Sequence, residues 1–561
     1  MLKLATPFIV AVLGIPIVLG LIMALLPAFG ILPVLGSTSL TVVHWQNLFA
    51  VPGMTGSLRV SLSAGLITPF ISLTAVFLFL AATSGTRLDR WLRQLVSPLL
   101  AIPHAAAAFG LAFLIAPSGF IVRLLSPWLT GWNRPPDLLI VNDPAGLALI
   151  AGLIIKEIPF LLLMSLAALP QLDAPNKVII ARSMGYQPTL AYLKTVVPSL
   201  YPLLRLPIFA VIAYATSTVD MAIILGPTLP PTLSVMVLNW FNDPDLSNRY
   251  LASAGAVLQL IISVGAIVIW MLGEKIAQRL GRSWIRAGQR ARGERLLRLV
   301  GRSGVSLAAL FIGASMLALL LNGFAATWRF PAALPDTWTL QHWTTALPSL
   351  SGPLFTTLLI SIPVTLIALA LVLAALEHEH RSQRSATTAL WLLYLPLVLP
   401  QVAFLLGLVV VAESLHWRPG VLLVMFTHLL FVLPYVYLAL SEAYRRLDPR
   451  WSQVAASLGA SPNRTFWRIR GALLLAPCLT AAAIGIAISV GQFLPTQLLG
   501  GGRVPTVTTE AVALASGGSR ATIAVWAQVQ ALLPMIGFAL ALAIPRLAWR
   551  NRQGMKELLS Q

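Results

Sequence analysis

Two short stretches decide how this chain is organised. Residues 180–188 read IARSMGYQP, and residues 454–462 read VAASLGASP. Both copies hold Ala, Ser, Gly and Pro at the same spacing. A glycine can adopt the positive φ that ends a helix, and a proline fits the first turn of the next helix. Each stretch therefore predicts a short helix, a turn at Gly185 or Gly459, and a second short helix.

Long apolar segments surround both copies. Runs of about 20 residues recur along the chain, which is the length that an α-helix needs to cross about 30 Å of hydrocarbon. The sequence is 58% hydrophobic and only 10% charged, whereas about 25% of residues are charged in soluble domains. Because backbone groups must be satisfied internally in lipid, we predict an all-α integral membrane protein with about twelve transmembrane helices. The predicted spans are 8–31, 59–82, 95–116, 144–169, 199–225, 251–272, 303–323, 354–376, 388–412, 419–440, 471–499 and 520–544.

Further matches divide the chain into two halves. Residues 41–45 (TVVHW) recur as 339–343 (TLQHW), and residues 103–110 in the third span match 400–407 in the ninth. Repeats of six helices keep the same orientation, so the halves should be parallel repeats related by an axis along the membrane normal. We predict a first six-helix half at 1–272, a basic linker at 273–302 and a second six-helix half at 303–561.

The charge of the chain is a signal of topology. The sequence has 38 Lys and Arg against 18 Asp and Glu, a net charge of +20. Such a charge suggests nucleic acid in a soluble protein, but here most basic residues fall in cytoplasmic segments if the N-terminus is cytoplasmic, as the positive-inside rule requires. We therefore predict cytoplasmic N- and C-termini, contact of the basic segment 275–302 with lipid headgroups, and no nucleic-acid partner.

The two repeated stretches resemble the EAA loops of binding-protein-dependent ABC importer permeases. The pattern of that family is Glu-Ala-Ala, three residues, Gly, nine residues and then Ile-x-Leu-Pro. In the first copy, Pro198 occupies the last position of this pattern, and in the second copy, Ile469 occupies its Ile position. The leading Glu is replaced by Ile179 in the first copy and by Gln453 in the second, where Ala472 also replaces the last Pro. In that family the loop transmits motion between ATPase and membrane helices, so we name residues 172–198 and 447–472 the first and second coupling loops. The ATPase-coupling residues that the resemblance implies are Ala181, Ser183, Gly185, Pro188, Gln453, Ala455, Ala456, Ser457, Gly459 and Pro462.

The resemblance also implies partners and a location. The fused form is similar to the single-chain permeases of thiamine and ferric-iron importers, which are related to polyamine permeases. It implies a bacterial inner-membrane subunit that works with two copies of a cytoplasmic ABC ATPase and with a periplasmic solute-binding protein. The chain contains neither GxxxxGKS nor GxxxxGKT, the loop that cradles nucleotide phosphates. We therefore expect ATP and Mg²⁺ to bind to the partner ATPase, with no cofactor and no enzymatic activity in this chain. The expected solute is a thiamine-like cation, a ferric complex or a polyamine.

Ionisable residues inside the predicted spans suggest a translocation path. Lys156 and Glu157 lie near the middle of the fourth span and Asp220 within the fifth. A charge at a helix centre costs about 2.5–3.5 kcal/mol on insertion scales, so these side chains should face a cavity or a partner. Our hypothesis is that Glu157, Asp220 and Gln492 line or gate the path. The alternative is a buried structural pair in which Asp220 is the partner of Lys156.

Two other features have simpler interpretations. His104 and His428 lie singly within spans, so we expect them to be packed or hydrogen-bonded, and we predict no metal site. Residues 85–93 (GTRLDRWLR) resemble the loop between helices two and three of major-facilitator transporters, which is the alternative function. The paired long loops after the fourth and tenth spans favour the ABC permease.

Overall fold

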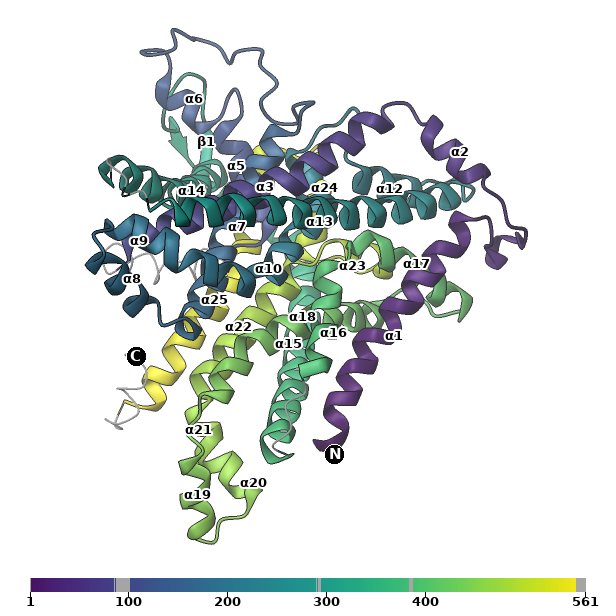
Figure 1. The fold of residues 1–561 in the computed structure, drawn as a ribbon. Helices are drawn as coiled ribbons and strands as arrows, with labels where there is room; N and C mark the ends of the chain where they lie inside the picture. Colours follow the sequence, from purple (N-terminus) through teal and green to yellow (C-terminus); the bar gives the residue numbers. More distant parts are fainter. Residues whose placement is uncertain are drawn as a thin grey trace.

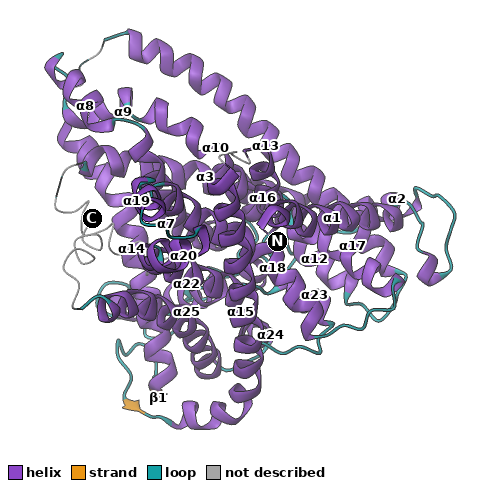
Figure 2. Ribbon diagram, turned by 90° about the horizontal axis from the view of Figure 1, so that it is seen from below, coloured by secondary structure: helices purple, strands orange, loops and turns teal. Residues whose placement is uncertain are grey.

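The computed structural model describes residues 2–84, 86, 101–288, 290, 294–382 and 387–550. Figure 2 shows that the described chain is almost entirely helical, with a single small pair of strands. Within these residues ten helices are long and apolar enough to cross a membrane, and two bent helix pairs pass the same test together. Each of the twelve predicted spans overlaps one of these helices or bent pairs, so the all-α membrane fold is confirmed.

The long helices follow the same order in both halves. The first half contains α1 (Leu2–Ala28), α3 (Met54–Thr83), α5 (His104–Ile115), α7 (Leu147–Ala168), α10 (Val197–Ser217) and α13 (Asn248–Arg286). The second half contains α14 (Glu294–Phe324), α15 (Gln341–Ser382), α16 (Thr387–Val398), α17 (Gln401–Ser414), α18 (Val421–Arg445), α22 (Leu475–Gly491) and α25 (Arg520–Ala548).

Short elements connect these helices. Those that follow α7 and α18 directly are α8 (Ala174–Ser183), α9 (Pro188–Thr195), α19 (Arg450–Ser457), α20 (Pro462–Thr465) and α21 (Gly471–Leu473). The others are α2 (Val43–Ala50), α6 (Phe120–Leu125), α11 (Asp220–Leu225), α12 (Leu233–Phe241), β1 (Ala325–Thr327), β2 (Thr337–Trp338), α23 (Leu494–Gly500) and α24 (Val507–Ala513).

The repeated prolines begin equivalent helices. Pro103 is the N-cap residue of α5 and Pro400 is the N-cap residue of α17. Proline lacks an N–H group and has a fixed φ, so it fits the start of a helix and interrupts its interior. The segment Leu392–Val398 of α16 accordingly meets α17 at an angle of 103°. The ninth predicted span is therefore a bent pair and not one straight helix.

The first helix of each half packs against the other half. α1 lies along α17, and α14 lies along α5 and α3; Figure 1 shows α1 beside the green helices of the second half. The repeated glycines permit this contact. A Cβ atom on Gly407 would lie 1.7 Å from the carbonyl oxygen of Gly20, and one on Gly110 would lie 2.8 Å from that of Ser315. Small residues let the backbones of membrane helices approach closely, so these glycines interlock the two halves.

The predicted basic linker is largely helical. α13 continues to Arg286 and α14 begins at Glu294, so both helices extend into residues 273–302. With 39 residues, α13 is about 58 Å long at 1.5 Å per residue, which exceeds the roughly 30 Å of hydrocarbon. The boundaries of the two halves and the linker stay a prediction. The ends of α13 and α14 extend into the predicted linker from its two sides.

Candidate functional site

The two coupling loops fold as the sequence predicts. In the first, α8 ends before Gly185, which has a φ of +87°, and Pro188 opens α9. In the second, α19 ends before Gly459, which has a φ of +75°, and Pro462 opens α20. The predicted order of helix, glycine turn and helix is therefore confirmed in both copies.

The same hydrogen bonds close both turns. The N–H of Tyr186 donates to the carbonyl of Ala181 (3.3 Å), and the N–H of Ala460 donates to that of Ala455 (2.9 Å). This bond across six residues is the Schellman cap, which requires a left-handed residue such as Gly at the turn. Ala181 and Ala455 are 5% and 3% exposed. The motif repeats because the turn needs Gly and the covered position accepts a small side chain.

An apolar pair projects from each loop. Ile180 and Met184 are 62% and 59% exposed, and their counterparts Val454 and Leu458 are 54% and 81% exposed. Residues four apart share one face of a helix, and a cluster of exposed apolar side chains on a water-facing element indicates an interaction surface. None of these four residues was among the predicted coupling residues, although the two apolar positions recur in both copies of the motif and could have identified them.

The other predicted coupling residues lie around these pairs. The hydroxyls of Ser183 and Ser457 donate to the carbonyls of Ile180 and Val454, at 2.7 and 2.8 Å. Gln453, Ala456 and Pro462 are exposed, and Pro188 is half-buried. The repeated serines therefore serve the local backbone, and the exposed apolar pairs recur in both loops.

A second group of predicted residues lies within the membrane helices. Nε2 of His104 in α5 is 3.8 Å from Oε1 of Glu157 in α7, and the ring of His104 lies 4.7 Å from that of Tyr214 in α10. Glu157 is buried, whereas the side chain of His104 is 37% exposed. The structure thus brings Glu157 of α7 to a polar cluster with His104 of α5 and Tyr214 of α10.

Lys156 and Asp220 have separate partners. Nζ of Lys156 donates to the carbonyl of Ile102 at 2.6 Å, and Oδ1 of Asp220 accepts from the hydroxyl of Thr218 at 3.0 Å. No ion pair between Lys156 and Asp220 is found among the described residues. The alternative hypothesis of a structural Lys156–Asp220 pair is therefore wrong, because a backbone carbonyl satisfies the buried ammonium group. Both Asp220 and Glu157 lie within electrostatic range of Tyr214.

Asp220 and Gln492 mark equivalent breaks in the helices. α10 ends at Ser217 and α11 begins at Asp220, while α22 ends at Gly491 and α23 begins at Leu494. Irregular backbone at membrane depth is tolerated where it is buried in protein or lines a cavity, and broken helices form the binding sites of many transporters. A Cβ atom on Gly491 would lie 4.0 Å from that of Pro103, so the break at Gln492 lies beside the start of α5 and the His104 cluster.

His428 braces the second of these breaks. Its Nδ1 is 2.9 Å from the hydroxyl of Ser489, and its Nε2 is 2.8 Å from that of Thr496. The expectation that His428 is hydrogen-bonded is thus confirmed. Among the residues that the structure describes, no three His, Cys, Asp or Glu side chains come together as metal ligands.

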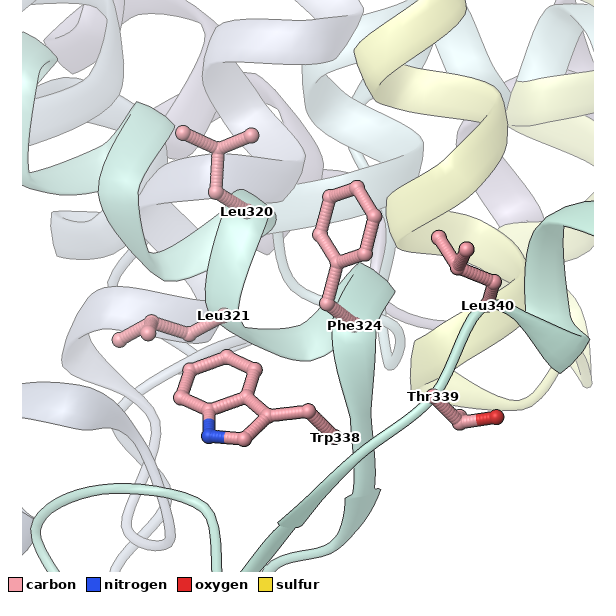
Figure 3. A pocket seen from close by; sticks show the side chains of 6 residues that line it. All are labelled: Leu320, Leu321, Phe324, Trp338, Thr339 and Leu340. Carbon is pink, nitrogen blue, oxygen red and sulfur yellow. The ribbon is translucent and has the colours of Figure 1, made fainter.

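One apolar groove lies away from these residues. It has a volume of about 400 Å³ and lies where α14 meets the β1–β2 hairpin. Figure 3 shows its walls, which are formed by Leu320, Leu321, Phe324, Trp338, Thr339 and Leu340. None of the predicted site residues lines it.

Comparison with known proteins assigns the chain to one group. The model of the family described as "Binding-protein-dependent transport system inner membrane component" matches residues 367–547. The inner membrane ABC transporter permease protein YnjC of Escherichia coli (strain K12) is 32% identical over 521 residues, which are 93% of this chain and 94% of that protein.

Two other relatives cover parts of the chain. The putative 2-aminoethylphosphonate transport system permease protein PhnV of Salmonella typhimurium is 28% identical over 45% of this chain and 96% of its own length. The molybdenum transport system permease protein ModB of Mycobacterium tuberculosis is 32% identical over 24% of this chain and 54% of its own length. These findings give no support to the facilitator alternative, whose motif at 85–93 lies, apart from Thr86, outside the described residues.

Proposed function

The chain belongs to the family of binding-protein-dependent inner-membrane ABC transporter permeases, and from that premise we propose that it forms the whole membrane part of an ATP-driven importer for a small solute. The observation that carries the proposal is the pair of coupling loops. Both have the same cap, the same exposed apolar pair and equivalent places in the two halves. Two identical ATPase subunits need two such surfaces, and one fused chain supplies both.

The proposed orientation places these loops in the cytoplasm. Both chain termini then lie in the cytoplasm, and the basic residues of α13 and α14 lie beside anionic headgroups. The β1–β2 hairpin and α6 lie on the opposite side, where a periplasmic solute-binding protein delivers the solute. ATP and Mg²⁺ bind to the ATPase subunits.

The proposed mechanism is alternating access between two arrangements of the halves. In Figure 1, α8 and α9 lie at the left edge and α19 and α20 at the bottom, so the two loops are well separated. ATP binding draws the two ATPase subunits together and the loops with them. The ATPases act by stabilising one of the two arrangements over the other, and the release of ADP allows the loops to separate again.

The membrane centre favours a cationic solute. Lys156 is buried and satisfied by a carbonyl, whereas Glu157 presents a carboxylate beside the half-exposed His104. Asp220 adds a second acidic group at the break before α11. Two of the relatives are named for different solutes and YnjC is named for none, so the assignment rests on these side chains. We propose a thiamine-like cation, a ferric complex or a polyamine, with Glu157, Asp220 and Gln492 along its path.

Co-purification tests this function first. The tagged chain is extracted from its native membrane in mild detergent, and the associated proteins are identified by mass spectrometry. We expect an ATPase with the phosphate-binding loop and a periplasmic binding protein, and the reconstituted complex should hydrolyse ATP faster with that binding protein. If no ATPase is recovered after crosslinking, and uptake into liposomes follows an ion gradient, the chain is a secondary transporter.

A further inference from the structure

A buried ion pair connects the second coupling loop to α15. Nη1 of Arg470 lies 2.8 Å from Oε2 of Glu377, and their side chains are 8% and 4% exposed. The hydroxyl of Tyr444 donates to the same carboxylate oxygen. Nε of Arg381 lies 2.6 Å from the other oxygen, Oε1. Glu377 therefore has partners on both oxygens, which is the condition under which a buried charge is tolerated.

The Arg470 side chain also holds α19. Its Nη2 donates to the hydroxyl of Ser452 at 2.6 Å, and the same nitrogen contacts the ring of His380. One guanidinium group thus joins α15, α19 and the segment after α20. The planar fork of Arg fixes direction as well as distance, so this contact sets the angle between the second coupling loop and α15.

The equivalent residues of the first half can be identified from shared contacts. The N–H of Leu233 donates to the hydroxyl of Ser61, and the N–H of Val507 donates to that of Thr357. These bonds place Ser61 and Thr357 at equivalent positions, so Ala81 stands where Glu377 stands. Counting from Gly185 and Gly459 in the same way pairs Val196 with Arg470 and Val178 with Ser452. The repeated prolines 159 and 434 pair Leu169 with Tyr444.

The polar network therefore has an apolar counterpart. Ala81 and Val196 are buried members of one hydrophobic cluster, and Leu169 and Val178 pack against it from its edge. Four polar members of the second-half network therefore have aliphatic equivalents in the first half, namely Glu377, Arg470, Tyr444 and Ser452. Aliphatic contacts lack direction and tolerate small shifts, whereas hydrogen-bonded ions do not.

The first coupling loop has other supports. Both the N–H and the hydroxyl of Thr189 donate to Oε1 of Glu294, at 3.1 and 2.6 Å. Nζ of Lys194 donates to the carbonyl of Trp284 and lies 4.7 Å from the centre of its ring. α9 also packs against α3, α10 and α14. The first loop is thus held from the side by the ends of α13 and α14, whereas α19 and α20 project from the bundle in Figure 1.

We propose that the Glu377–Arg470 pair is a positioning device that makes the second coupling loop a rigid extension of α15. The proposal rests on the proposed function for the movement that it transmits, but the rigid connection is a property of this chain alone. Motion of the second loop is passed directly to α15, while the first loop is attached to the adjoining ends of α13 and α14. Glu377 and Arg470 act through the loop and contact neither solute nor nucleotide.

Matched distance measurements test the connection without any partner. Nitroxide labels are placed on Leu366→Cys of α15 and Leu458→Cys of α19, which are 58% and 81% exposed. The matched pair in the first half is Phe70→Cys and Met184→Cys, which are 62% and 59% exposed. Both pairs are built in the full chain with Cys478→Ala, because Cys478 is the single cysteine of the sequence. Double electron–electron resonance in lipid nanodiscs then gives the two distance distributions.

We expect Glu377→Gln and Arg470→Met to broaden the distribution between positions 366 and 458 and to leave the 70–184 distribution unchanged. Glu442→Gln is the control, since it removes an exposed ion pair with Arg446 near the C-terminal end of α18. This variant should change neither of the two distance distributions. A narrow 366–458 distribution in folded single variants overturns the proposal.

A double variant keeps the test decisive if single variants fail to fold. Glu377→Ala with Arg470→Val installs the residues of the first half and removes the uncompensated charge. We expect it to restore the amount of folded protein while the 366–458 distribution stays broad. A return to the wild-type width overturns the proposal, because the pair would then serve only to fill space.

Coupling to ATP hydrolysis is the second readout. With the co-purified ATPase and binding protein, binding-protein-stimulated hydrolysis should fall about two- to thirty-fold in the folded double variant, the usual range for residues that carry coupling. Basal hydrolysis should be unchanged. If no ATPase exists, the proposed function fails while the distance result stands. If the distances do not respond, the positioning role fails while the permease assignment stands.

Discussion

The coupling loops and the membrane centre retain the internal repeat to different degrees. In the loops, Gly185 and Gly459 have the same left-handed backbone and the same closing hydrogen bonds. In the centre, Lys156 and Glu157 of α7 correspond to Phe431 and Val432 of α18, which are buried and apolar. In the proposed importer, two identical ATPase subunits make equal demands on both loops. A single solute passing between the halves makes no such demand, so each half can contribute different groups.

The glycine turns provide the largest expected effect. Gly185→Val and Gly459→Val place a β-branched residue at positive φ. An ordinary L-residue in this left-handed conformation costs about 1–2 kcal/mol, and a β-branched residue costs more. We expect each variant to reduce binding of the ATPase at least about tenfold, by an equal amount for the two loops. Pull-down of the ATPase from detergent extracts measures it.

Gly281→Ala is the control for these variants. Gly281 lies inside α13 with no heavy atom within 4 Å of an added Cβ, so ATPase binding should be unchanged. A strong effect at only one of the two turns would contradict the functional equivalence of the loops.

The membrane centre provides the next effect. Glu157→Gln keeps the shape of the side chain and removes its charge. For a cationic solute we expect the KM of uptake to rise about tenfold or more, since a hydrogen bond to a charged group is worth about 1.5–3 kcal/mol. Uptake into proteoliposomes by the reconstituted importer measures it.

Lys156→Met is the matched change at the neighbouring position. Its ammonium group contacts a carbonyl within the protein, so we expect the KM of uptake to stay within about twofold of wild type; an apolar side chain of similar volume can replace a buried charge. Normal uptake by Glu157→Gln would remove Glu157 from the solute path.

The exposed apolar pairs should give a smaller effect that is again equal in the two halves. Met184→Ala and Leu458→Ala shorten side chains that project from α8 and α19. Truncating an interface residue that carries binding energy costs more than about 1 kcal/mol, so we expect affinity for the ATPase to fall about fivefold in each variant. Titration of the purified ATPase onto the permease measures this. Trp467→Ala, which removes another exposed side chain of the second loop, would have the larger effect if the contact surface lies elsewhere in that loop.

The smallest effect concerns a bond that both halves share. Ser61→Ala and Thr357→Val remove the hydroxyls that accept from Leu233 and Val507. Each loss should cost about 1 kcal/mol and lower the midpoint of thermal unfolding by a few degrees, without changing the KM of uptake. Unequal shifts of the two unfolding midpoints would show that Ser61 of α3 and Thr357 of α15 have equivalent positions but contribute differently to stability.

Local chemistry explains which features the sequence predicted. The turns at Gly185 and Gly459 depend on a few neighbouring residues, so the spacing of Ala, Gly and Pro was sufficient to predict both turns. The length of apolar runs predicted the spans for the same reason. Prolines 103 and 400 were recognised as a repeat, but the bend before α17 depends on how α16 packs, which no local pattern records.

Contacts between distant segments could not be predicted in this way. His104 was interpreted by itself, although α5 brings it to Glu157, 53 positions further along the chain. Lys156 was paired with Asp220 as a possible partner, whereas a backbone carbonyl satisfies it. Glu377 and Arg470 are 93 residues apart, and neither belongs to a repeated motif. Such pairs follow from helix packing, which requires the fold itself.

The packing of α1 against α17 has a consequence for the biogenesis of the protein. α17 begins about 370 residues after α1 ends, so α1 is synthesised well before α17. At about 5–20 residues per second, the ribosome needs on the order of tens of seconds to reach it. During that interval the face of α1 around Gly20 is without its partner α17, and α5 is without its partner α14. The first half therefore completes its packing only when the second half has been synthesised.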